Sequence, residues 1–600
     1  MLNKASCGKA HRAGRRDFLS TCTRGMAWSG LAALGLNGPI EMAVATTEPR
    51  TVGPISSTRG SANAVPATSL QLLGLMADAA RVPEDISYYR RLIDFCRDWK
   101  LNALLLSLTD DQGCALRFKS HPELLTHAHA LTPREARELA EYGERRGVEL
   151  IPIIESFGHT RYITGVPRWA HLADQPPDEK GHFDGIIPVS PETLRLMTDL
   201  YRETAAIFPS RYLHGGCDEV HWGGSKLSQE ALRTRSRVEI WADYLNSLDQ
   251  VARGFGKDFV VWGDYVLHKE PGILPRLRKD IIVMDWQYYQ VDPRPLQEAA
   301  RKVMATGLRA IGAPAVISCR WGPRPGLSAL ENIAAYAEAY RSLHHPGALG
   351  VIVTNWIPCR YLQNSIWDSF AYAAIALREG AARARAAAFP AFVEKHYGAR
   401  WNDHWADIFT TIYELAPPKP PCAPPWMQPT LPIPWRNVEE LRAAASADHG
   451  VEPPWGHLLA QIVMAEDSVR KNSRDFRSFR LTAEYLDYVF WRQSVVADLA
   501  RRRPDDAAAA RLIRLIAERD RHLLSRLSAD WNEGRPPDAA SRLRPVFDFG
   551  PGDQLVFTFS QATAFSAQLA KQPEQFTRAL VAAPSSMTFG MAPRAVANSV

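Results

Sequence analysis

The sequence predicts an α/β protein, a (β/α)8 TIM barrel followed by an α-helical C-terminal domain. From Leu70 onward, short apolar runs alternate with amphipathic segments of helix length, which is the pattern of parallel strands joined by crossover helices. Eight such units lie between Leu70 and Tyr372, enough to close a barrel whose active site would lie at the carboxyl ends of the strands. After Tyr372 the composition changes to Ala- and Arg-rich helical segments.

Length and composition indicate a globular protein of more than one domain. The chain has 600 residues, of which 46% are hydrophobic, and a formal net charge of only +6. Its basic clusters, Arg233–Arg237 and Arg501–Arg503, lie in helical segments without an accompanying aromatic stripe, which argues against nucleic-acid binding. The eight cysteines are scattered singly with no Cys-x-x-Cys pair. We therefore expect no structural zinc, no metal in the site and no cofactor.

The N-terminus is typical of an export signal. Ala13–Ser20 contains Arg-Arg and resembles a twin-arginine motif, and an apolar run and a small-residue cleavage site follow, Met26–Leu36 and Ala43–Ala45. The run is too short for a bilayer span, which takes about twenty residues. We predict a signal peptide over 1–45, a linker over 46–67, a periplasmic or secreted location, and no membrane contact after signal removal. The alternative is a disordered basic N-terminus.

The barrel domain is predicted to span 68–378, and its strands follow from the short apolar runs. The expected strands are Gln71–Met76, Ala103–Leu108, Glu149–Ile154, Arg211–His214, Phe259–Trp262, Ile281–Asp285, Ala315–Ser318 and Gly350–Thr354. The helices expected between them include Pro83–Trp99, Pro133–Arg146, Pro191–Phe208, Trp241–Phe255 and Leu330–Leu343. Thr132 and Ser190 each precede a proline at a helix start, which is favourable capping chemistry.

Polar and aromatic residues follow each predicted strand. They are Asp78–Arg81, Thr109–Gln112, Glu155–His159, Asp218–Glu219, Trp262–Asp264, Asp285–Tyr289, Arg320–Trp321 and Asn355–Trp356. A barrel brings these ends to one face, where they suit a ligand with polar edges and apolar faces, such as a sugar. We expect Trp262, Trp286 and Trp356 to be the aromatic walls, with a core position as the alternative for each.

Two adjacent acids, Asp218 and Glu219, end the fourth strand. Successive side chains of an extended chain point to opposite sides, so we expect the two acids to do different jobs. Gly215 and Gly216 remove side chains where a ligand would approach, and His214 is placed to bond an acid or a sugar hydroxyl. The alternative is a structural acidic turn.

The segment His214–Glu219 resembles the His-x-Gly-x-Asp-Glu signature of family 20 glycoside hydrolases, the β-N-acetylhexosaminidases, with Cys217 where Gly is commonest. The resemblance implies an exo-acting enzyme that hydrolyses terminal β-linked GlcNAc or GalNAc with retention, using the substrate's 2-acetamido oxygen as nucleophile. It implies that Glu219 is the general acid and base, and that Asp218 orients the acetamido group and stabilises its charge. We expect burial or Asp218 to raise the pKa of Glu219.

The same resemblance implies further substrate-binding residues. Arg81, in an Asp-x-x-Arg motif, would hold the O3 and O4 hydroxyls, with a pairing to Asp78 or Asp85 as the alternative. His159, in a Phe-Gly-His segment, and His214 would lie on or behind the substrate, or else be structural histidines. Asp264 and Tyr288 complete the expected set, which is Arg81, His159, His214, Trp262, Asp264, Trp286, Tyr288 and Trp356.

Departures from the family pattern leave a second reading open. Many relatives carry a Glu after the eighth-strand Trp, whereas this chain has Ile357-Pro358, and Arg360 is the candidate replacement. The tyrosine that bonds the acetamido oxygen is not in its usual place, and Tyr288 or Tyr289 is the candidate. These departures resemble the hexosaminidase-D-like branch. The alternative is a catalytically silent barrel that binds amino sugars.

The C-terminal region, 379–582, shows no motif with chemistry of its own, and 583–600 is predicted to be a disordered tail. Its predicted helices and the Pro-rich connector among them are Ile375–Ala388, Val438–Ala447, Gly456–Lys471, Ser478–Arg502, Asp506–Leu527 and Pro417–Pro434. The sequence carries no indication of oligomeric state.

Overall fold

The computed structural model describes residues 70–175, 185–317, 323–415, 434–447, 455–502, 505–535 and 554–581. These residues all fall within one compact unit, Thr68–Val600. The predicted signal peptide, linker and tail lie outside the described residues, so export stays a prediction. Among the helices that are described, none combines the length and the apolar character needed to cross a membrane.

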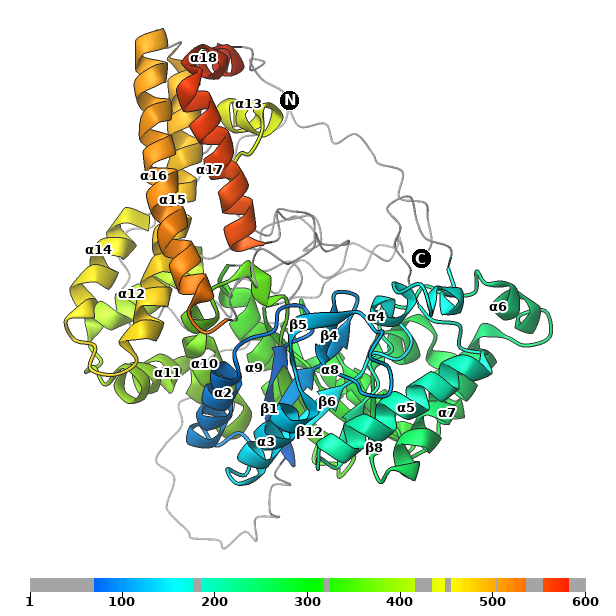
Figure 1. Ribbon diagram of the computed structural model, residues 1–600. Helices are drawn as coiled ribbons and strands as arrows, with labels where there is room; N and C mark the ends of the chain where they lie inside the picture. The colour runs from blue at the N-terminus through cyan, green and yellow to red at the C-terminus, as the bar shows by residue number, and fades with distance from the viewer. Residues whose placement is uncertain are drawn as a thin grey trace, which may run out of the picture. The chain divides into compact units, whose positions relative to one another are not determined.

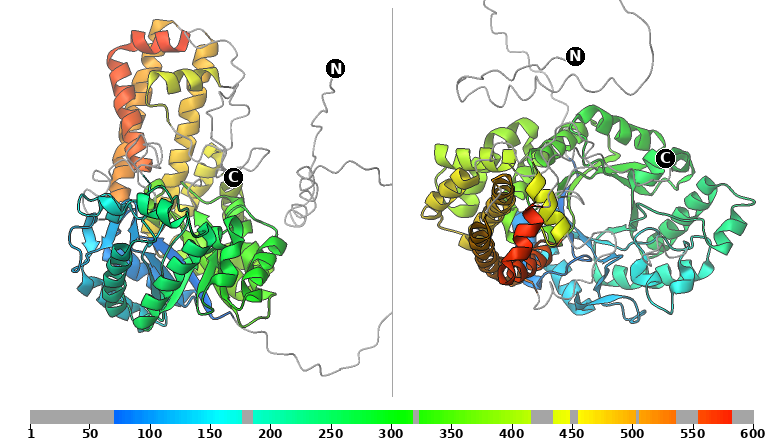
Figure 2. Two further views of the ribbon diagram at one scale, coloured as in Figure 1. Left: turned by 90° about the vertical axis from the view of Figure 1, so that its right-hand side faces the viewer. Right: turned by 90° about the horizontal axis from the view of Figure 1, so that it is seen from above.

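The predicted TIM barrel is confirmed. Its eight strands are β1 (Leu72–Asp78), β2 (Ala103–Ser107), β6 (Glu149–Ile153), β7 (Tyr212–His214), β8 (Asp258–Trp262), β9 (Ile282–Asp285), β10 (Arg309–Gly312) and β12 (Ala348–Asn355). Neighbouring strands pair in parallel, and β12 pairs back onto β1 with Leu72 opposite Gly350, which closes the ring. Figure 1 and Figure 2 show the strands enclosed by the helices that connect them.

A strand is present at the predicted position Ala315–Ser318, but it is not the seventh strand of the barrel. The seventh place in the barrel belongs to β10, which pairs with both β9 and β12. The next strand, β11 (Ala315–Ile317), pairs with the last residues of β12. Pro314 stands between β10 and β11, and because proline has no N–H to donate, the ladder is interrupted there. The five residues 318–322, which include the predicted Arg320–Trp321 pair, lie outside the described residues.

Of the predicted helices around the barrel, those at Pro133 and Pro191 begin at the predicted residue, and the predicted starts at Pro83, Trp241 and Leu330 are displaced by three or four residues. The helices around the barrel are α2 (Ile86–Asp98), α3 (Pro133–Glu144), α5 (Pro191–Ile207), α7 (Arg237–Gly254), α8 (Pro293–Ala305), α9 (Leu327–Arg341) and α10 (Trp367–Glu379). Thr132 forms a capping box with Glu135 at the start of α3, and the Ser190 side chain accepts a hydrogen bond at the start of α5. A small sheet of β3 (Thr109–Asp110), β4 (Gly113–Leu116) and β5 (Thr126–Leu131) follows β2.

The α-helices described after α10 come next in the chain. They are α11 (Ala381–Phe392), α12 (Asp403–Leu415), α13 (Val438–Ser446), α14 (Trp455–Glu466), α15 (Ser473–Arg501), α16 (Asp506–Asn532), α17 (Leu555–Lys571) and α18 (Pro573–Val581). The single helix predicted over Ile375–Ala388 is wrong, because Gly380 adopts a φ of 98° between α10 and α11. That conformation suits glycine alone and ends the helix.

Candidate active site

Arg81 lies at the mouth of the barrel between two carboxylates. Its Nη1 is 2.9 Å from Asp78 Oδ2 and its Nη2 is 2.8 Å from Asp110 Oδ2. The guanidinium also lies over the Trp356 ring, 5.1 Å from its centroid. Arg81 and both acids are buried, so the guanidinium is held in one orientation by β1, by β3 and by the loop after β12. The pairing with Asp78 named as the alternative therefore does occur, and it fixes Arg81 at the mouth.

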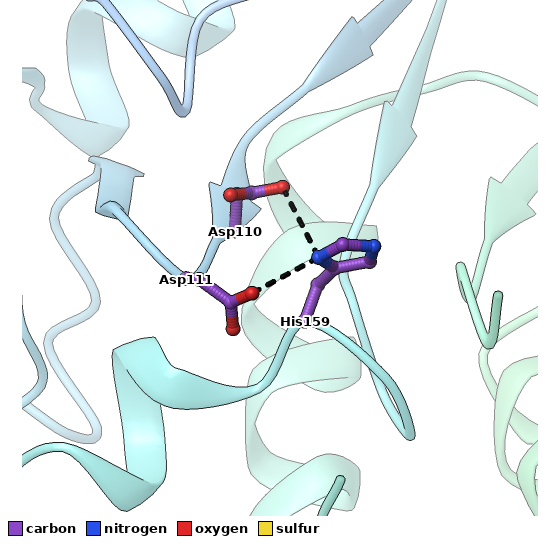
Figure 3. A group of neighbouring side chains, drawn as sticks. All are labelled: Asp110, Asp111 and His159. Atoms are coloured by element: carbon purple, nitrogen blue, oxygen red, sulfur yellow. Dashed lines mark hydrogen bonds and ion pairs between the residues drawn. The ribbon is translucent and has the colours of Figure 1, made fainter. Parts of the chain in front are cut away.

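His159 connects this group to the adjacent acids. Its Nδ1 is 3.0 Å from Asp111 Oδ2 and 3.9 Å from Asp110 Oδ2, as Figure 3 shows. Its Nε2 is 3.4 Å from Glu219 Oε2 and 3.8 Å from Asp218 Oδ2. The imidazole therefore has Asp111 on one nitrogen and the Asp218–Glu219 pair on the other.

The expectation that Asp218 and Glu219 face opposite sides is wrong, because both carboxylates approach the same nitrogen of His159. Strand β7 ends at His214, so the alternation of an extended chain no longer applies at the acids. Gly216, Cys217 and Glu219 have φ angles of 66°, 73° and 47°, and these turns bring the two side chains round to one side.

Two glycines allow this turn to pack closely against the loop after β6. A Cβ on Gly216 would lie 1.7 Å from Glu155 Oε2, and a Cβ on Gly158 would lie 1.9 Å from the carbonyl oxygen of Asp218. The buried carboxyl of Glu155 accepts a hydrogen bond of 3.3 Å from the Cys217 N–H. The sequence placed Glu155 at the end of the third strand but did not predict this contact. The available signal was an acidic residue at the end of a buried strand.

Glu219 has a lowered pKa, not the raised one that we expected. The hydrogen bond with His159 lowers the pKa of Glu219 to about 2, outweighing burial, and the Glu219 side chain is 56% exposed. Burial alone would lower the pKa of His159, but Asp218 and the bonds to Asp111 and Glu219 raise it well above its ordinary value. Both shifts favour the ion pair in which His159 carries the proton and Glu219 is ionised.

Asp218 and Asp264 have raised pKa values. Burial raises the pKa of Asp218 to about 7, opposed by His159 and supported by the charges of Asp264 and Glu219. Burial also raises the pKa of Asp264 to about 6. Asp264 Oδ2 accepts the N–H of Glu219 at 3.1 Å, so this acid holds the backbone of the turn.

Aromatic side chains form a wall beside the acids. Trp262 lies 5.8 Å from Trp356 between ring centroids, and Trp356 Nε1 donates a 2.7 Å hydrogen bond to the Tyr288 hydroxyl. Tyr288 in turn stacks on Trp286 at 5.1 Å with an interplanar angle of 23°. Trp262 is 1% exposed and belongs to the barrel interior, whereas Trp286 and Trp356 are half-buried. The wall therefore offers ring surface mainly through Trp286 and Trp356.

His214 lies behind this wall. It is fully buried, its ring centroid is 4.3 Å from that of Trp262, and its Nδ1 accepts the N–H of Gly216 at 2.9 Å. Burial lowers the pKa of His214 to about 3, so the ring is neutral. These contacts favour the structural alternative for His214. Of the other candidates, Arg360 is buried and Tyr289 is 40% exposed.

The group Asp110, Asp111 and His159 has ligand atoms within 4.8 Å of one another, a spacing that a metal ion also requires. Asp110 is paired with Arg81, and Asp111 accepts both the His159 bond and the N–H of Arg161 at 3.1 Å. A cation would have to displace these partners. The contacts indicate a hydrogen-bonded ion network, in which Asp111 orients His159.

The mouth thus combines a proton-carrying histidine–glutamate pair, a second carboxylate beside it, a fixed guanidinium and an aromatic wall. Such a site can protonate a leaving group, stabilise a developing positive charge and hold a ligand that has hydroxyls and an apolar face.

Comparisons with known proteins agree with this chemistry. Residues 72–318 match the family "Glycosyl hydrolase family 20, catalytic domain", a range that contains every site residue above up to Tyr288 but not Trp356. A β-hexosaminidase of Vibrio furnissii is 28% identical over 36% of this chain and 39% of its own length. The β-hexosaminidase β-subunit of Felis catus is 26% identical over 41% of this chain and 46% of its own. The chain thus spans less than half the length of these relatives.

Two solved structures are also similar. One is an exo-β-N-acetylglucosaminidase of Vibrio harveyi in complex with N-acetylglucosamine, with 22% identity, a TM-score of 0.40, and coverage of 53% of this chain and 54% of that chain. The other is a chitobiase of Flavobacterium johnsoniae, with 18% identity, a TM-score of 0.44 and 72% coverage of each chain. The fold rests on the strand pairing described above and not on these scores.

Proposed function

We propose that the protein is an exo-β-N-acetylhexosaminidase, which removes terminal β-linked GlcNAc or GalNAc with retention of configuration, because residues 72–318 match the catalytic domain of glycosyl hydrolase family 20. The observation that carries the proposal is the convergence of Asp218 and Glu219 on His159 beside the wall of Trp286 and Trp356. The names of the two curated relatives support the same activity.

In the first step the carbonyl oxygen of the substrate's acetamido group attacks the anomeric carbon, and the bond to the leaving oxygen breaks. Glu219 delivers a proton to that oxygen from the His159–Glu219 pair, whose nitrogen and oxygen lie 3.4 Å apart. Asp218 accepts a hydrogen bond from the acetamido N–H and stabilises the positive charge of the oxazolinium ring. Asp111 holds His159 in place through the other nitrogen.

In the second step water attacks the anomeric carbon and Glu219 takes the proton that the water loses. The ring opens, the acetamido group is restored and the product keeps the β configuration. Arg81 would donate to the O3 and O4 hydroxyls, since Asp78 and Asp110 fix its guanidinium. Trp286 and Trp356 would cover the apolar face of the ring.

The proposal is tested with nitrophenyl glycosides. We expect release of nitrophenol from the β-GlcNAc and β-GalNAc substrates and little from the β-glucoside, which has no acetamido group. Cleavage of the glucoside at a comparable rate would exclude acetamido participation. Tight binding of GlcNAc without turnover of any substrate would instead favour the catalytically silent barrel.

The pH dependence should follow Asp218. This carboxyl acts in its ionised form, and because its pKa is raised to about 7, we expect kcat/KM to fall as the pH drops through that value. Asp264→Asn keeps an acceptor for the Glu219 N–H but removes a negative charge near Asp218, so the acid limb should move to lower pH. A pH–rate profile of both proteins checks this. An acid limb that stays at the same pH, or moves to higher pH, would contradict the effect of the Asp264 charge on Asp218.

Gly158→Ala should displace the catalytic pair. Its Cβ would lie 1.9 Å from the Asp218 carbonyl oxygen, so the turn must shift. We expect a loss of about 10²-fold in kcat/KM, the scale seen when reacting groups move by about 1 Å. Gly254→Ala, whose Cβ would meet no atom within 4 Å, is the matched control and should keep full activity. Equal activity of the two variants would contradict the close packing described here.

A further inference from the structure

The chain just after α16 is inserted between two loops of the barrel. The Arg535 side chain is fully buried, and its Nε lies 3.0 Å from each carboxylate oxygen of Glu84. Its Nη2 is 2.9 Å from Glu84 Oε1 and 3.0 Å from the carbonyl oxygen of Pro358. The guanidinium also lies 3.5 Å from the centroid of the Trp531 ring on α16. One side chain from the helical region thus bonds the loop after β1 and the loop after β12.

Backbone groups reinforce this contact. The carbonyl oxygen of Gly534 accepts the N–H of Asp85 at 3.0 Å. The carbonyl oxygen of Glu533 accepts Gln363 Nε2 at 3.2 Å. Three consecutive residues, Glu533 to Arg535, therefore bond both loops, and a contact made only by side-chain packing would not be so specific.

The two loops carry residues that we proposed above to contact the terminal sugar. Arg81 lies on the same loop as Glu84, and Trp356 lies on the same loop as Pro358. On the side of the site, the Ile357 N–H donates to Asp78 Oδ2 at 3.0 Å, and Arg81 lies over Trp356. The loops are therefore joined to each other at the site and joined again, behind it, by Arg535.

We propose that Arg535 is a positioning residue for the terminal-sugar subsite, through which the C-terminal helices hold Arg81 and Trp356 in register. The proposal rests on the function proposed above. A buried guanidinium that bonds a carboxylate and a carbonyl from different loops fixes their spacing, and loss of one partner leaves the other charge buried and unpaired. Arg535 touches no reacting atom. Its loss should therefore weaken sugar binding more than it slows the chemical step.

The test is the kinetics of Arg535→Met, which keeps the apolar stem against Trp531 but removes the bonds to Glu84 and Pro358. We expect KM for nitrophenyl β-GlcNAc and the inhibition constant of GlcNAc to rise together, by about 10-fold, and kcat to change much less. The reason is that the displaced Arg81 and Trp356 lose sugar contacts that are equally strong in the ground state and the transition state. Arg535→Lys retains a charge for Glu84 and should lie between the two proteins. If Arg535→Met does not fold, a smaller rise of both constants in Arg535→Lys supports the proposal, and unchanged constants in Arg535→Lys overturn it.

A purely structural role predicts a different result. Destabilisation alone would lower the melting temperature and the active fraction, and with it the apparent kcat, while KM of the remaining active protein stayed unchanged. That outcome would overturn the proposal. The control is Arg526→Ala, elsewhere on α16, which removes an ion pair with Glu484 of α15 and should leave KM unchanged.

A second variant separates loop spacing from the unpaired charge. Glu84→Gln combined with Arg535→Met removes both charges, so it should regain stability while KM stays raised. Full recovery of KM would overturn the proposal. A wild-type protein that cleaves no arylglycoside would overturn the proposed function instead, and the affinity for GlcNAc, measured by calorimetry on wild type and Arg535→Met, would still test Arg535.

Discussion

Glu219→Gln is expected to lower kcat/KM for a disaccharide substrate by about 10³-fold, within the range for loss of a general acid. A sugar alkoxide is a poor leaving group, so its oxygen must be protonated as the bond breaks. A dinitrophenolate leaves without that help, and for this aglycone we expect a much smaller loss, about 10-fold or less. The two substrates, assayed side by side over a range of concentrations, give the ratio that measures proton donation.

Glutamine has the shape of glutamate and keeps an oxygen near His159. The variant therefore removes proton donation while it keeps the packing of the side chain. An equal loss on both substrates would show that Glu219 does not protonate the leaving group.

Asp218→Ala should behave differently. The oxazolinium ring carries its positive charge whatever the leaving group, so we expect kcat/KM for both substrates to fall by a similar factor, about 10²–10³, as for loss of one preorganised electrostatic contact. Asp218→Asn, which keeps an acceptor but no charge, should lose less than the alanine variant. A leaving-group dependence like that of Glu219→Gln would contradict the division of roles.

The sequence could predict the barrel and the residues at its mouth because both depend on local patterns. Alternating apolar runs and amphipathic segments mark strands and helices, and parallel strands bring their carboxyl ends to one face. Arg81, His159 and Asp218 were accordingly expected at the mouth. The structure places them there: Arg81 pairs with Asp78 and Asp110, and His159 lies beside Asp218. The place of the seventh strand was predicted wrongly because β10 begins with Arg309 and ends with Gly312, whereas Ala315–Ile317 after Pro314 is a continuous apolar run.

Features that depend on three-dimensional contacts could not be predicted. The facing of Asp218 and Glu219 is set by positive φ angles beyond the end of β7, which no alternation rule reports. The lowered pKa of Glu219 follows from a bond to His159, on another loop. The contact of Arg535 with Glu84 joins residues 451 positions apart, and nothing near either residue in the sequence indicates the other.

The most direct measurement is a crystal structure with a thiazoline mimic of the cyclic intermediate bound. We predict that the ring nitrogen lies within hydrogen-bond distance of Asp218, about 2.6–3.2 Å, that the sugar rests against Trp286 and Trp356, and that Glu219 lies on the side where the leaving group departs. A mimic bound with Asp218 turned away from the ring nitrogen, or with Glu219 in its place, would contradict the assignment of the two acids.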